Sequence, residues 1–496
     1  MTSAHSPSVL IIGAGLGGLG VAAHLARAGH HRITLLDRGD GPGGVWRDNT
    51  YPGAACDVPS SLYSWSFAPN PGWERRYGTQ PDILRYIERE VDRLGLRGQI
   101  RTGQRVVSAR WEEDARQWRV TTAAGQEYVA DVLVPATGQL SDPVIPDLPG
   151  IESFAGHAFH SAAWRHDVDL TGKRVAVIGT GASAVQFVPA IADRVAALTV
   201  HQRSAPYVVP KPDRAYTRLH HAAYRRLPGT QSAGRQLTWR LSEWLNGSFE
   251  TGGVLPKLLY AAWRGHLRAT VKDPAKRAAL VPDYPIGCKR LLFSNDWYRA
   301  LDREQVAVVT DVVSGVEPDG VRTMDGTLHQ ADVIVWGTGF AATDFLGGID
   351  LHGVGNRSLA EVWADGAYAH LGMTVPGFPN LFWIYGPNTN LGGGSIVSMM
   401  EAQAAYVVRA VDHLAAGLRR GERRALEVRP DVAAAYDAEM QRRLGDSVWS
   451  RCASWYRTDG GRVTTNWPGT IAEYQRRASD VALSDFHPTT TTGALA

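Results

Sequence analysis

The stretch VLIIGAGLGGLG at residues 9–20 decides the fold of this 496-residue chain. Four apolar residues run into glycines, and the chain continues as an amphipathic segment over residues 21–28. This order predicts a strand, a tight turn and a helix. Gly13, Gly15 and Gly18 occupy the three positions that a dinucleotide-binding fold keeps bare, for the turn, for close approach to a pyrophosphate and for helix packing.

The next predicted strand, residues 32–36, ends at Asp37. A carboxylate at this position can accept a hydrogen bond from a ribose 2'-hydroxyl, and it repels a 2'-phosphate. The first nucleotide site is therefore predicted to hold FAD or NAD rather than NADP.

A second copy of the pattern, VAVIGTGASA, occupies residues 175–184, with Gly179, Gly181 and Ala184 in the GxGxxA form. The two copies are followed at a distance by similar segments, ADVLVPATG at 130–138 and ADVIVWGTG at 331–339. Such a pseudo-repeat predicts two dinucleotide-binding units in one chain.

The second unit differs where its second strand, residues 197–201, ends. Gln202, Arg203 and Ser204 follow in place of an acid. A guanidinium and a hydroxyl suit a 2'-phosphate, so this site is predicted to select NADPH. The alternative interpretation is a surface arginine that simply follows a strand.

Composition narrows the class of protein. With 44% hydrophobic residues and a formal charge of +3, the chain is expected to form two or three globular domains, with no support for a nucleic-acid or anionic-membrane partner. Cys56, Cys288 and Cys452 are isolated, so neither a dithiol redox centre nor a cysteine zinc site is expected, and a reducing cytoplasm fits. No stretch is long and apolar enough to span a bilayer, and the apolar N-terminal run is typical of a core strand rather than a signal peptide.

Hydrophobic periodicity predicts the remaining elements. We expect a helix over 80–94, a small meander of strands over 105–111, 117–122 and 127–130, a helical insertion over 210–283 and a helix over 396–414. Trp449, Trp455 and Trp467 crowd a glycine-rich tail that could cover the active site or serve a plain core role, and the last residues, PTTTTGALA, are predicted to be disordered.

Two motifs carry a resemblance to a known family. The segment GPGGVWRDNTYPGAACDVPS at 41–60 matches a signature of the Baeyer-Villiger monooxygenases, and FAGHAFHSAAW at 154–164 matches their linker fingerprint FxGxxxHxxxW. Arg165 departs from the family, which mostly has proline or aspartate there; a basic residue is more typical of flavin-containing monooxygenases. His160 is either structural or couples domain rotation to cofactor handling.

The resemblance implies an enzyme that binds FAD at the first site and NADPH at the second, and that converts a ketone to an ester or lactone through a C4a-peroxyflavin. By the same resemblance, Lys289 approaches the 2'-phosphate and Arg290 lies over the flavin, where a fixed cation stabilises the peroxide anion. Asp57 is expected to hold Arg290, and Cys288 to be a packing residue. The loop over 387–394 is expected to face the flavin ring. In the family, a helical subdomain like the insertion helps to wall the substrate pocket.

The predicted fold class is thus α/β, with two Rossmann-like dinucleotide-binding domains and a helical insertion. The predicted boundaries place the FAD domain at 1–150 and 372–496, the NADPH domain at 151–212 and 285–371, and the insertion at 213–284. The predicted catalytic residues are Arg290 and Asp57. The predicted cofactor-binding residues are Gly13, Gly15, Gly18, Asp37, Val45, Trp46, Asp57, Tyr63, Val106, Gly179, Thr180, Gly181, Ser183, Ala184, Arg203, Ser204, Lys289 and Arg290. The predicted linker residues are Phe154, Gly156, His160 and Trp164.

Two alternative functions stay open. Arg165 favours a flavin-containing monooxygenase that oxidises nitrogen or sulfur. A non-oxygenating reductase or a flavin-binding module is disfavoured, because no dithiol is present for disulfide reduction. No metal is expected, because a flavin activates oxygen by itself. No pattern of the sequence indicates an obligate protein partner. The identity of the ketone and the oligomeric state are not encoded in any pattern of the sequence.

Overall fold

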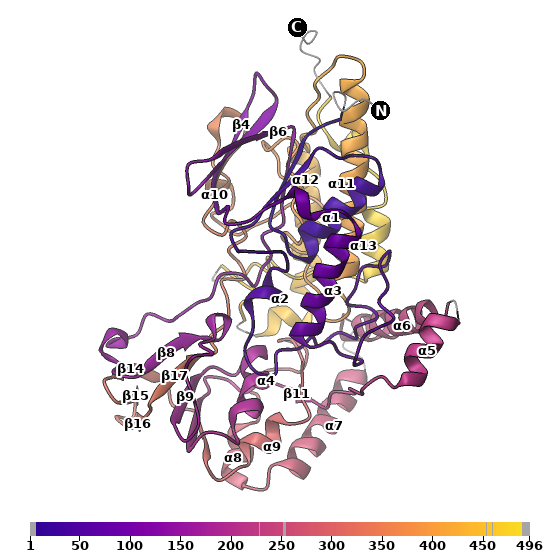
Figure 1. Cartoon of the computed structure of the whole chain (residues 1–496). Helices are drawn as coiled ribbons and strands as arrows, with labels where there is room; N and C mark the ends of the chain where they lie inside the picture. The colour runs from indigo at the N-terminus through magenta and orange to yellow at the C-terminus, as the bar shows by residue number, and fades with distance from the viewer. Residues whose placement is uncertain (1–5, 228, 251–253, 453, 459, 489–496) are drawn as a thin grey trace.

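The first glycine-rich turn follows an inner strand of a parallel sheet. The computed structural model describes residues 6–227, 229–250, 254–452, 454–458 and 460–488, and they form two lobes (Figure 1). In the first lobe the strand order is β3-β2-β1-β7. Its elements are β1 (Val9–Ile12), α1 (Leu16–Arg27), β2 (Ile33–Leu36), β3 (Ile100–Arg101) and β7 (Val132–Pro135). The predicted strand, turn and helix are confirmed.

The glycines of this turn are required by close backbone packing. Gly13 has φ 108°, in the region that side chains disfavour, and a Cβ there would lie 2.5 Å from the carbonyl oxygen of Ala136. A Cβ on Gly18 would overlap the carbonyl oxygen of Gly13. The helix can therefore approach the strand only while both positions remain bare.

The second glycine-rich turn lies in the second lobe, in a parallel sheet of order β13-β10-β9-β17-β8. Its elements are β8 (His157–His160), β9 (Arg174–Ile178), α4 (Ala182–Ile191), β10 (Ala197–His201), β13 (Val306–Val309) and β17 (Val333–Trp336). In both lobes the closing strand pairs directly with the strand before the glycine turn, β7 with β1 and β17 with β9. The predicted pseudo-repeat is confirmed in the strand pairing.

Each lobe also carries an antiparallel meander before its closing strand. The predicted one consists of β4 (Val106–Glu112), β5 (Gln117–Thr122) and β6 (Glu127–Ala130), joined at its edge by β18 (Asp350–His352). A second meander, not predicted, consists of β14 (Val313–Glu317), β15 (Gly320–Thr323) and β16 (Leu328–Gln330). The repeat thus includes more of each unit than the glycine motifs indicated.

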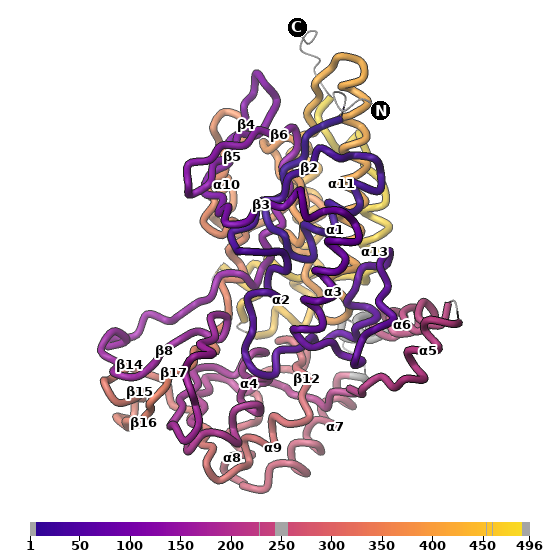
Figure 2. Tube along the Cα trace, in the orientation of Figure 1, coloured from indigo at the N-terminus to yellow at the C-terminus, as the bar shows by residue number. Residues whose placement is uncertain are grey.

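Long helices cover the first lobe. The helix predicted over 80–94 is α3 (Gln80–Arg93), and its start is fixed by a capping box between Thr79 and Asp82. The C-terminal helix α11 (Ile396–Leu418) continues beyond the predicted residue 414 and packs on α1, as the tube in Figure 2 shows. The other helices outside the insertion are α2 (Val45–Asp48), α9 (Trp297–Leu301), α10 (Leu359–Val362), α12 (Pro430–Gly445) and α13 (Ile471–Arg477).

The predicted insertion is helical and contacts the first lobe. It consists of α5 (Arg218–Arg226), α6 (Thr230–Glu250), α7 (Val254–Thr270) and α8 (Pro274–Ala279). Arg235 on α6 donates hydrogen bonds to the carbonyl oxygens of Ser61 and Ser64, at 2.6 and 2.9 Å. Glu243 accepts hydrogen bonds from the first two N–H groups of α13, both at 3.0 Å. The insertion is therefore attached to two separate parts of the chain.

Among the described residues, no helix has both the length and the apolarity needed to cross a bilayer. The domain boundaries remain a prediction. The predicted disordered tail lies outside the described residues, except for Pro488.

The glycine of the linker fingerprint gives a first testable prediction. A Cβ on Gly156 would overlap the carbonyl oxygen of Asp332 and lie 2.9 Å from the ring of Phe154. We expect Gly156→Ala to lower the free energy of unfolding by about 1–3 kcal/mol, because backbone must move to admit the methyl group. Denaturant titration measures this change.

Gly265 provides the matched control. It lies in α7, and a Cβ there would meet nothing within 4 Å. Gly265→Ala is expected to raise the free energy of unfolding by about 0.5–1 kcal/mol, because it restricts the unfolded chain without a clash. Equal stability of Gly156→Ala and the wild type would contradict the packing argument.

Candidate active site and nucleotide sites

A large cavity opens at the first glycine-rich turn. Six of the predicted cofactor-binding residues line it: Gly13, Gly15, Asp37, Val45, Trp46 and Val106. Two others lie behind it. Gly18 packs α1 onto β1, and the hydroxyl of Tyr63 accepts a hydrogen bond of 3.1 Å from Nε1 of Trp46. The sequence analysis did not identify Tyr385 or Met400, which line the same cavity.

The shape of this cavity suits a dinucleotide. Gly44 and Gly15 approach so closely that a Cβ on Gly44 would lie 3.1 Å from Cα of Gly15, so bare backbone faces the cavity at the N-terminus of α1. Asp37 accepts hydrogen bonds from the N–H of Ala14 at 2.7 Å and from Arg47 at 3.0 Å. The residues present therefore fit FAD, with a diphosphate at the glycine turn and a ribose at the carboxylate.

The second glycine-rich turn faces a cluster of cations. Gly179 has φ 106°, and Gly181 is the N-cap of α4. Thr180 donates a hydrogen bond to the carbonyl oxygen of Ser204, at 3.2 Å. Lys289 donates one to the hydroxyl of Ser204, at 3.0 Å.

Burial lowers the pKa of Lys289; the negative charge of Asp283 opposes this shift, and the positive charge of Arg203 adds to it. Two cations, Lys289 and Arg203, thus lie near the hydroxyl of Ser204, and such a set suits a 2'-phosphate. Their role in binding NADPH remains a prediction. Of the other two predicted residues, Ser183 lies in the first turn of α4, and the methyl group of Ala184 packs against Gly337.

The linker fingerprint serves packing in the second lobe. The rings of Trp164 and Phe187 are 5.3 Å apart, and Phe154 packs on a small cluster below the sheet. His160 is buried; its Nδ1 accepts a hydrogen bond from the N–H of Ala162, and burial lowers its pKa, which keeps the ring neutral at neutral pH. Whether His160 couples domain rotation to cofactor handling remains a prediction.

Arg165 lies on the surface. It forms an ion pair with Asp167, and about half of each side chain or more is exposed, 51% and 64%. Arg165 lines neither of the two cavities.

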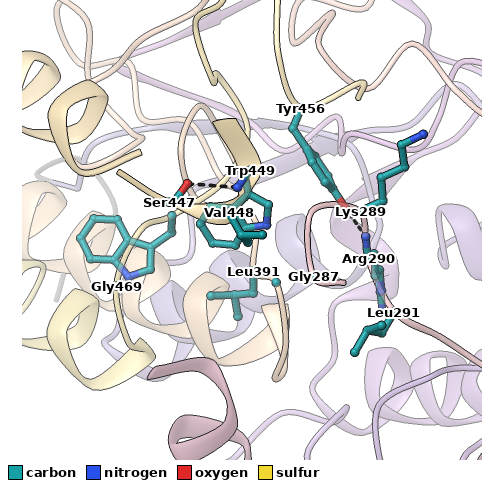
Figure 3. A pocket seen from close by; sticks show the side chains of 12 residues that line it. Gly287, Lys289, Arg290, Leu291, Leu391, Ser447, Val448, Trp449, Tyr456 and Gly469 are labelled. Atoms are coloured by element: carbon teal, nitrogen blue, oxygen red, sulfur yellow. Dashed lines mark hydrogen bonds between the residues drawn. The ribbon is translucent and has the colours of Figure 1, made fainter. Parts of the chain in front are cut away.

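The second cavity is built from three segments far apart in the sequence (Figure 3). Lys289 and Arg290 lie on one wall, and apolar side chains form most of the others. The lining residues are Gly287, Lys289, Arg290, Leu291, Leu391, Gly392, Ser447, Val448, Trp449, Tyr456, Trp467 and Gly469. A mainly apolar cavity with a few polar groups is typical of a small-molecule site.

The residues that line the cavities bear on two predictions, one about the C-terminal tryptophans and one about the helical insertion. Trp449 and Trp467 are buried and line the second cavity, whereas Trp455 is 45% exposed. The described part of the helical insertion contributes no residue to either cavity. Residues of the two cavities come close to each other at the loop over 387–394. The hydroxyl of Tyr385, which lines the first cavity, donates to Asn390 at 2.8 Å, next to Leu391 of the second cavity.

Arg290 keeps its charge inside the protein. Its side chain lines the second cavity and has a large accessible surface. Desolvation lowers the pKa of Arg290, but nearby negative charge, chiefly that of Asp57, outweighs this effect, and the net pKa is raised. The guanidinium is therefore a permanent cation facing an apolar cavity.

The partner of Asp57 differs from the expectation. Its carboxylate lies 3.3 Å from Nζ of Lys211, which also donates to the carbonyl oxygen of Cys56 at 2.8 Å. In the described part of the chain no ion pair joins Asp57 to Arg290. Asp57 thus acts on Arg290 through its charge at a distance, while its Oδ1 pairs with Lys211.

The prediction that Cys288 is a packing residue requires a correction. Cys288 and Cys452 are joined by a disulfide, with their Cα atoms 6.2 Å apart, and only Cys56 is a free, buried thiol. Cys288 is therefore not simply a packing residue. The spacing of 164 residues contains no signal for this pair, because only the folded chain brings the two segments together. The disulfide connects the segment that carries Arg290 to the C-terminal wall of the same cavity.

Comparison with known proteins gives full-length relatives. Residues 7–226 match the family model described as pyridine nucleotide-disulphide oxidoreductase. A Baeyer-Villiger monooxygenase of Streptomyces coelicolor is 43% identical over 480 residues, which cover 96% of this chain and 92% of that protein. A Baeyer-Villiger monooxygenase of Pseudomonas aeruginosa is 40% identical and covers 99% of this chain and 93% of its own length.

Solved structures share the arrangement of both lobes. An oxidised steroid monooxygenase bound to NADP superposes with a TM-score of 0.84, at 33% identity, over 96% of this chain and 97% of that chain. The OTEMO complex with FAD and NADP superposes with a TM-score of 0.86, at 27% identity, over 98% of this chain and 99% of that chain.

The disulfide gives a prediction for solution. Thiol titration of the unfolded, unreduced protein should detect one thiol, Cys56, and reduction should expose Cys288 and Cys452 as well. We expect Cys452→Ser to lower the free energy of unfolding by about 2–4 kcal/mol, because the crosslink restricts the unfolded chain.

Cys56→Ala is the matched control for the titration. This variant should show no thiol before reduction and the two disulfide cysteines after it. Detection of all three thiols in the unreduced wild type would contradict the crosslink.

Proposed function

The chain belongs to the Baeyer-Villiger monooxygenases, and we propose on this basis that it converts a ketone, molecular oxygen, NADPH and a proton into an ester or lactone, NADP⁺ and water, with FAD as cofactor. The observation that carries the proposal is the permanent cation of Arg290, which faces a mainly apolar cavity beside the cavity that fits FAD. This arrangement suits a substrate that becomes negatively charged as it reacts.

The two nucleotide units divide the cofactors between them. We assign FAD to the first unit, where Asp37 accepts hydrogen bonds at the glycine turn, and NADPH to the second, where Lys289 and Ser204 meet. When bound, FAD takes electrons from NADPH and passes them to oxygen. The protein supplies the orientation of both nucleotides and the surroundings in which this transfer takes place.

Arg290 has the central role among the side chains. Its guanidinium cannot lose its proton at neutral pH, and so it can hold negative charge on oxygen atoms throughout the reaction. The tryptophans of the cavity wall, Trp449 and Trp467, are buried and exclude water. In such a dry site a fixed cation acts more strongly than it would in water.

Asp57 and Lys211 form an ion pair, and the charge of Asp57 acts on Arg290. Their side chains are 9% and 12% exposed, so their ion pair is largely screened from solvent. We assign Asp57 as a positioning residue whose charge is partly offset by Lys211. This arrangement keeps Arg290 free of a direct carboxylate, so that its N–H groups can reach the substrate.

Heteroatom oxidation, the alternative that Arg165 favoured, receives no support from its position. Arg165 forms an exposed ion pair with Asp167 and lines neither cavity. A surface arginine of this kind has no means to change the chemistry of the site. We infer that ketone oxidation is the main activity.

We propose a cytoplasmic location and no obligate protein partner. The need for NADPH supports this location. The cysteines do not, because the disulfide between Cys288 and Cys452 is of a kind that is rare in reducing compartments.

Selection of NADPH can be tested at Lys289. We expect Lys289→Met to raise the KM for NADPH about 10-fold or more, because a charge-assisted hydrogen bond to the 2'-phosphate is lost, and to leave the KM for NADH unchanged. Steady-state NADPH and NADH oxidation measure both constants. The control is Lys173→Met, which removes an exposed lysine of the same lobe. An unchanged KM for NADPH in Lys289→Met would remove this residue from the cofactor site.

The reaction itself can be tested with a panel of cyclohexanone, an aryl ketone, a steroid ketone, a tertiary amine and a sulfide. We expect mass analysis to find an ester or lactone from at least one ketone, with NADPH consumed. Arg290→Ala should still oxidise NADPH but release hydrogen peroxide in place of the ester, because the developing negative charge lacks its cation.

Arg165→Ala is the control for Arg290→Ala. It removes an exposed guanidinium and should keep the wild-type product and the wild-type ratio of ketone to sulfide oxidation. Ester formation by Arg290→Ala at the wild-type rate, or products from the amine and sulfide only, would refute the proposed function.

A further inference from the structure

The hydroxyl of Tyr456 lies in the wall of the second cavity, beside Arg290. Tyr456 is 3% exposed and lines the cavity together with Arg290 and Trp449. In Figure 3 its ring points toward the backbone of Arg290, with Lys289 alongside. No motif of the sequence identified this residue. A buried phenol at a mainly apolar cavity needs hydrogen-bond partners, and its position raises the question of what they are.

Only one of the two hydrogen-bonding functions of this hydroxyl is used. The backbone N–H of Arg290 donates to Oη of Tyr456, at 3.2 Å. No other residue that the structure describes accepts the hydroxyl proton. Burial raises the pKa of Tyr456, against the opposing effect of the Arg290 charge, so the phenol keeps its proton at neutral pH. The cavity therefore contains a neutral O–H donor without an acceptor.

Contacts of the chain segments before and after Tyr456 hold its hydroxyl in place. Four residues before it, the disulfide fixes Cys452 to Cys288, two residues from Arg290. After it, the carbonyl oxygen of Tyr456 accepts a hydrogen bond from the N–H of Thr464, at 3.2 Å. The segment that follows is attached to the loop over 387–394, since Asn388 donates to the carbonyl oxygen of Val463 at 2.8 Å. A hydroxyl fixed in this way needs no reorganisation to meet a ligand.

We propose that Tyr456 is a catalytic residue that donates a hydrogen bond to the carbonyl oxygen of the ketone. The proposal rests on the proposed function. As the carbonyl carbon is attacked, its oxygen gains negative charge, and the hydrogen bond from Tyr456 becomes stronger while the proton stays on the phenol. With the backbone of Arg290 on its other side, Tyr456 selects substrates that carry an oxygen acceptor. A sulfide of the same size offers no such oxygen.

The test compares cyclohexanone with tetrahydrothiopyran, a ring of the same size with sulfur in place of the carbonyl group. If another ketone of the panel has a higher kcat/KM, that ketone is used with its sulfide analogue. Tyr456→Phe keeps the ring and removes the hydroxyl. We expect kcat/KM for the ketone to fall about 10- to 100-fold, and that for the sulfide to change by less than about 2-fold.

A spectroscopic measurement reports the hydrogen bond directly. The infrared stretching band of ¹³C-labelled ketone carbonyl, bound to the oxidised holoenzyme with NADP⁺, should lie at lower frequency in the wild type than in Tyr456→Phe. The matched control is Tyr436→Phe, which removes a buried hydroxyl that has no hydrogen-bond partner and lies outside both cavities. It should match the wild type in both measurements.

The outcomes separate the two proposals. Equal losses for ketone and sulfide would show a merely structural role and overturn the inference, as would an unchanged ketone rate or an unshifted carbonyl band. If the wild type converts no ketone of the panel, the proposed function fails first, and the role of Tyr456 fails with it.

Discussion

The geometry of the reactive cavity depends on the link between the segment that carries Arg290 and the C-terminal wall. The disulfide between Cys288 and Cys452 and the hydrogen bond from the N–H of Arg290 to Tyr456 join the same two segments. A guanidinium that faces an apolar cavity loses hydration, which is unfavourable unless the surrounding structure holds it there. The two links fix the backbone on which the cation is carried, so the side chain cannot withdraw to solvent together with its segment.

The charged residues near Arg290 leave its guanidinium available to a substrate. A carboxylate bonded directly to the guanidinium would occupy the N–H groups that a substrate needs. In this chain Asp57 is instead paired with Lys211 at 3.3 Å, and it supports Arg290 only through its electrostatic field. The cation is thus stabilised without being neutralised, which suits a group that must act on transient negative charge.

The parts of the molecule that could be predicted from sequence are those that local rules determine. The bare positions at Gly13, Gly18 and Gly179 follow from backbone contacts within one turn and its strand, and a short motif records them. The closing strands β7 and β17 could be predicted because the segments 130–138 and 331–339 have similar sequences. The positions of Lys289 and Arg290 followed only from resemblance to a family, since a Lys-Arg pair has no intrinsic structural meaning.

The contacts that escaped prediction all join residues distant in sequence. The pairs Cys288–Cys452 and Asp57–Lys211 are separated by 164 and 154 residues, and Tyr456 is separated from Arg290 by 166. No periodicity or spacing encodes such pairs, because they depend on how the two lobes and the C-terminal segment pack. The second meander was missed for a different reason: its strands are short and carry weak alternation.

Glu243 gives the helical insertion a mechanical connection to a cavity it does not line. Its carboxylate accepts from the first two N–H groups of α13, and the residues just before that helix, Trp467 and Gly469, form part of the cavity wall. Displacement of α6 would therefore also displace this part of the cavity wall. A change of sequence in the insertion can therefore reach the cavity without altering any residue that lines it.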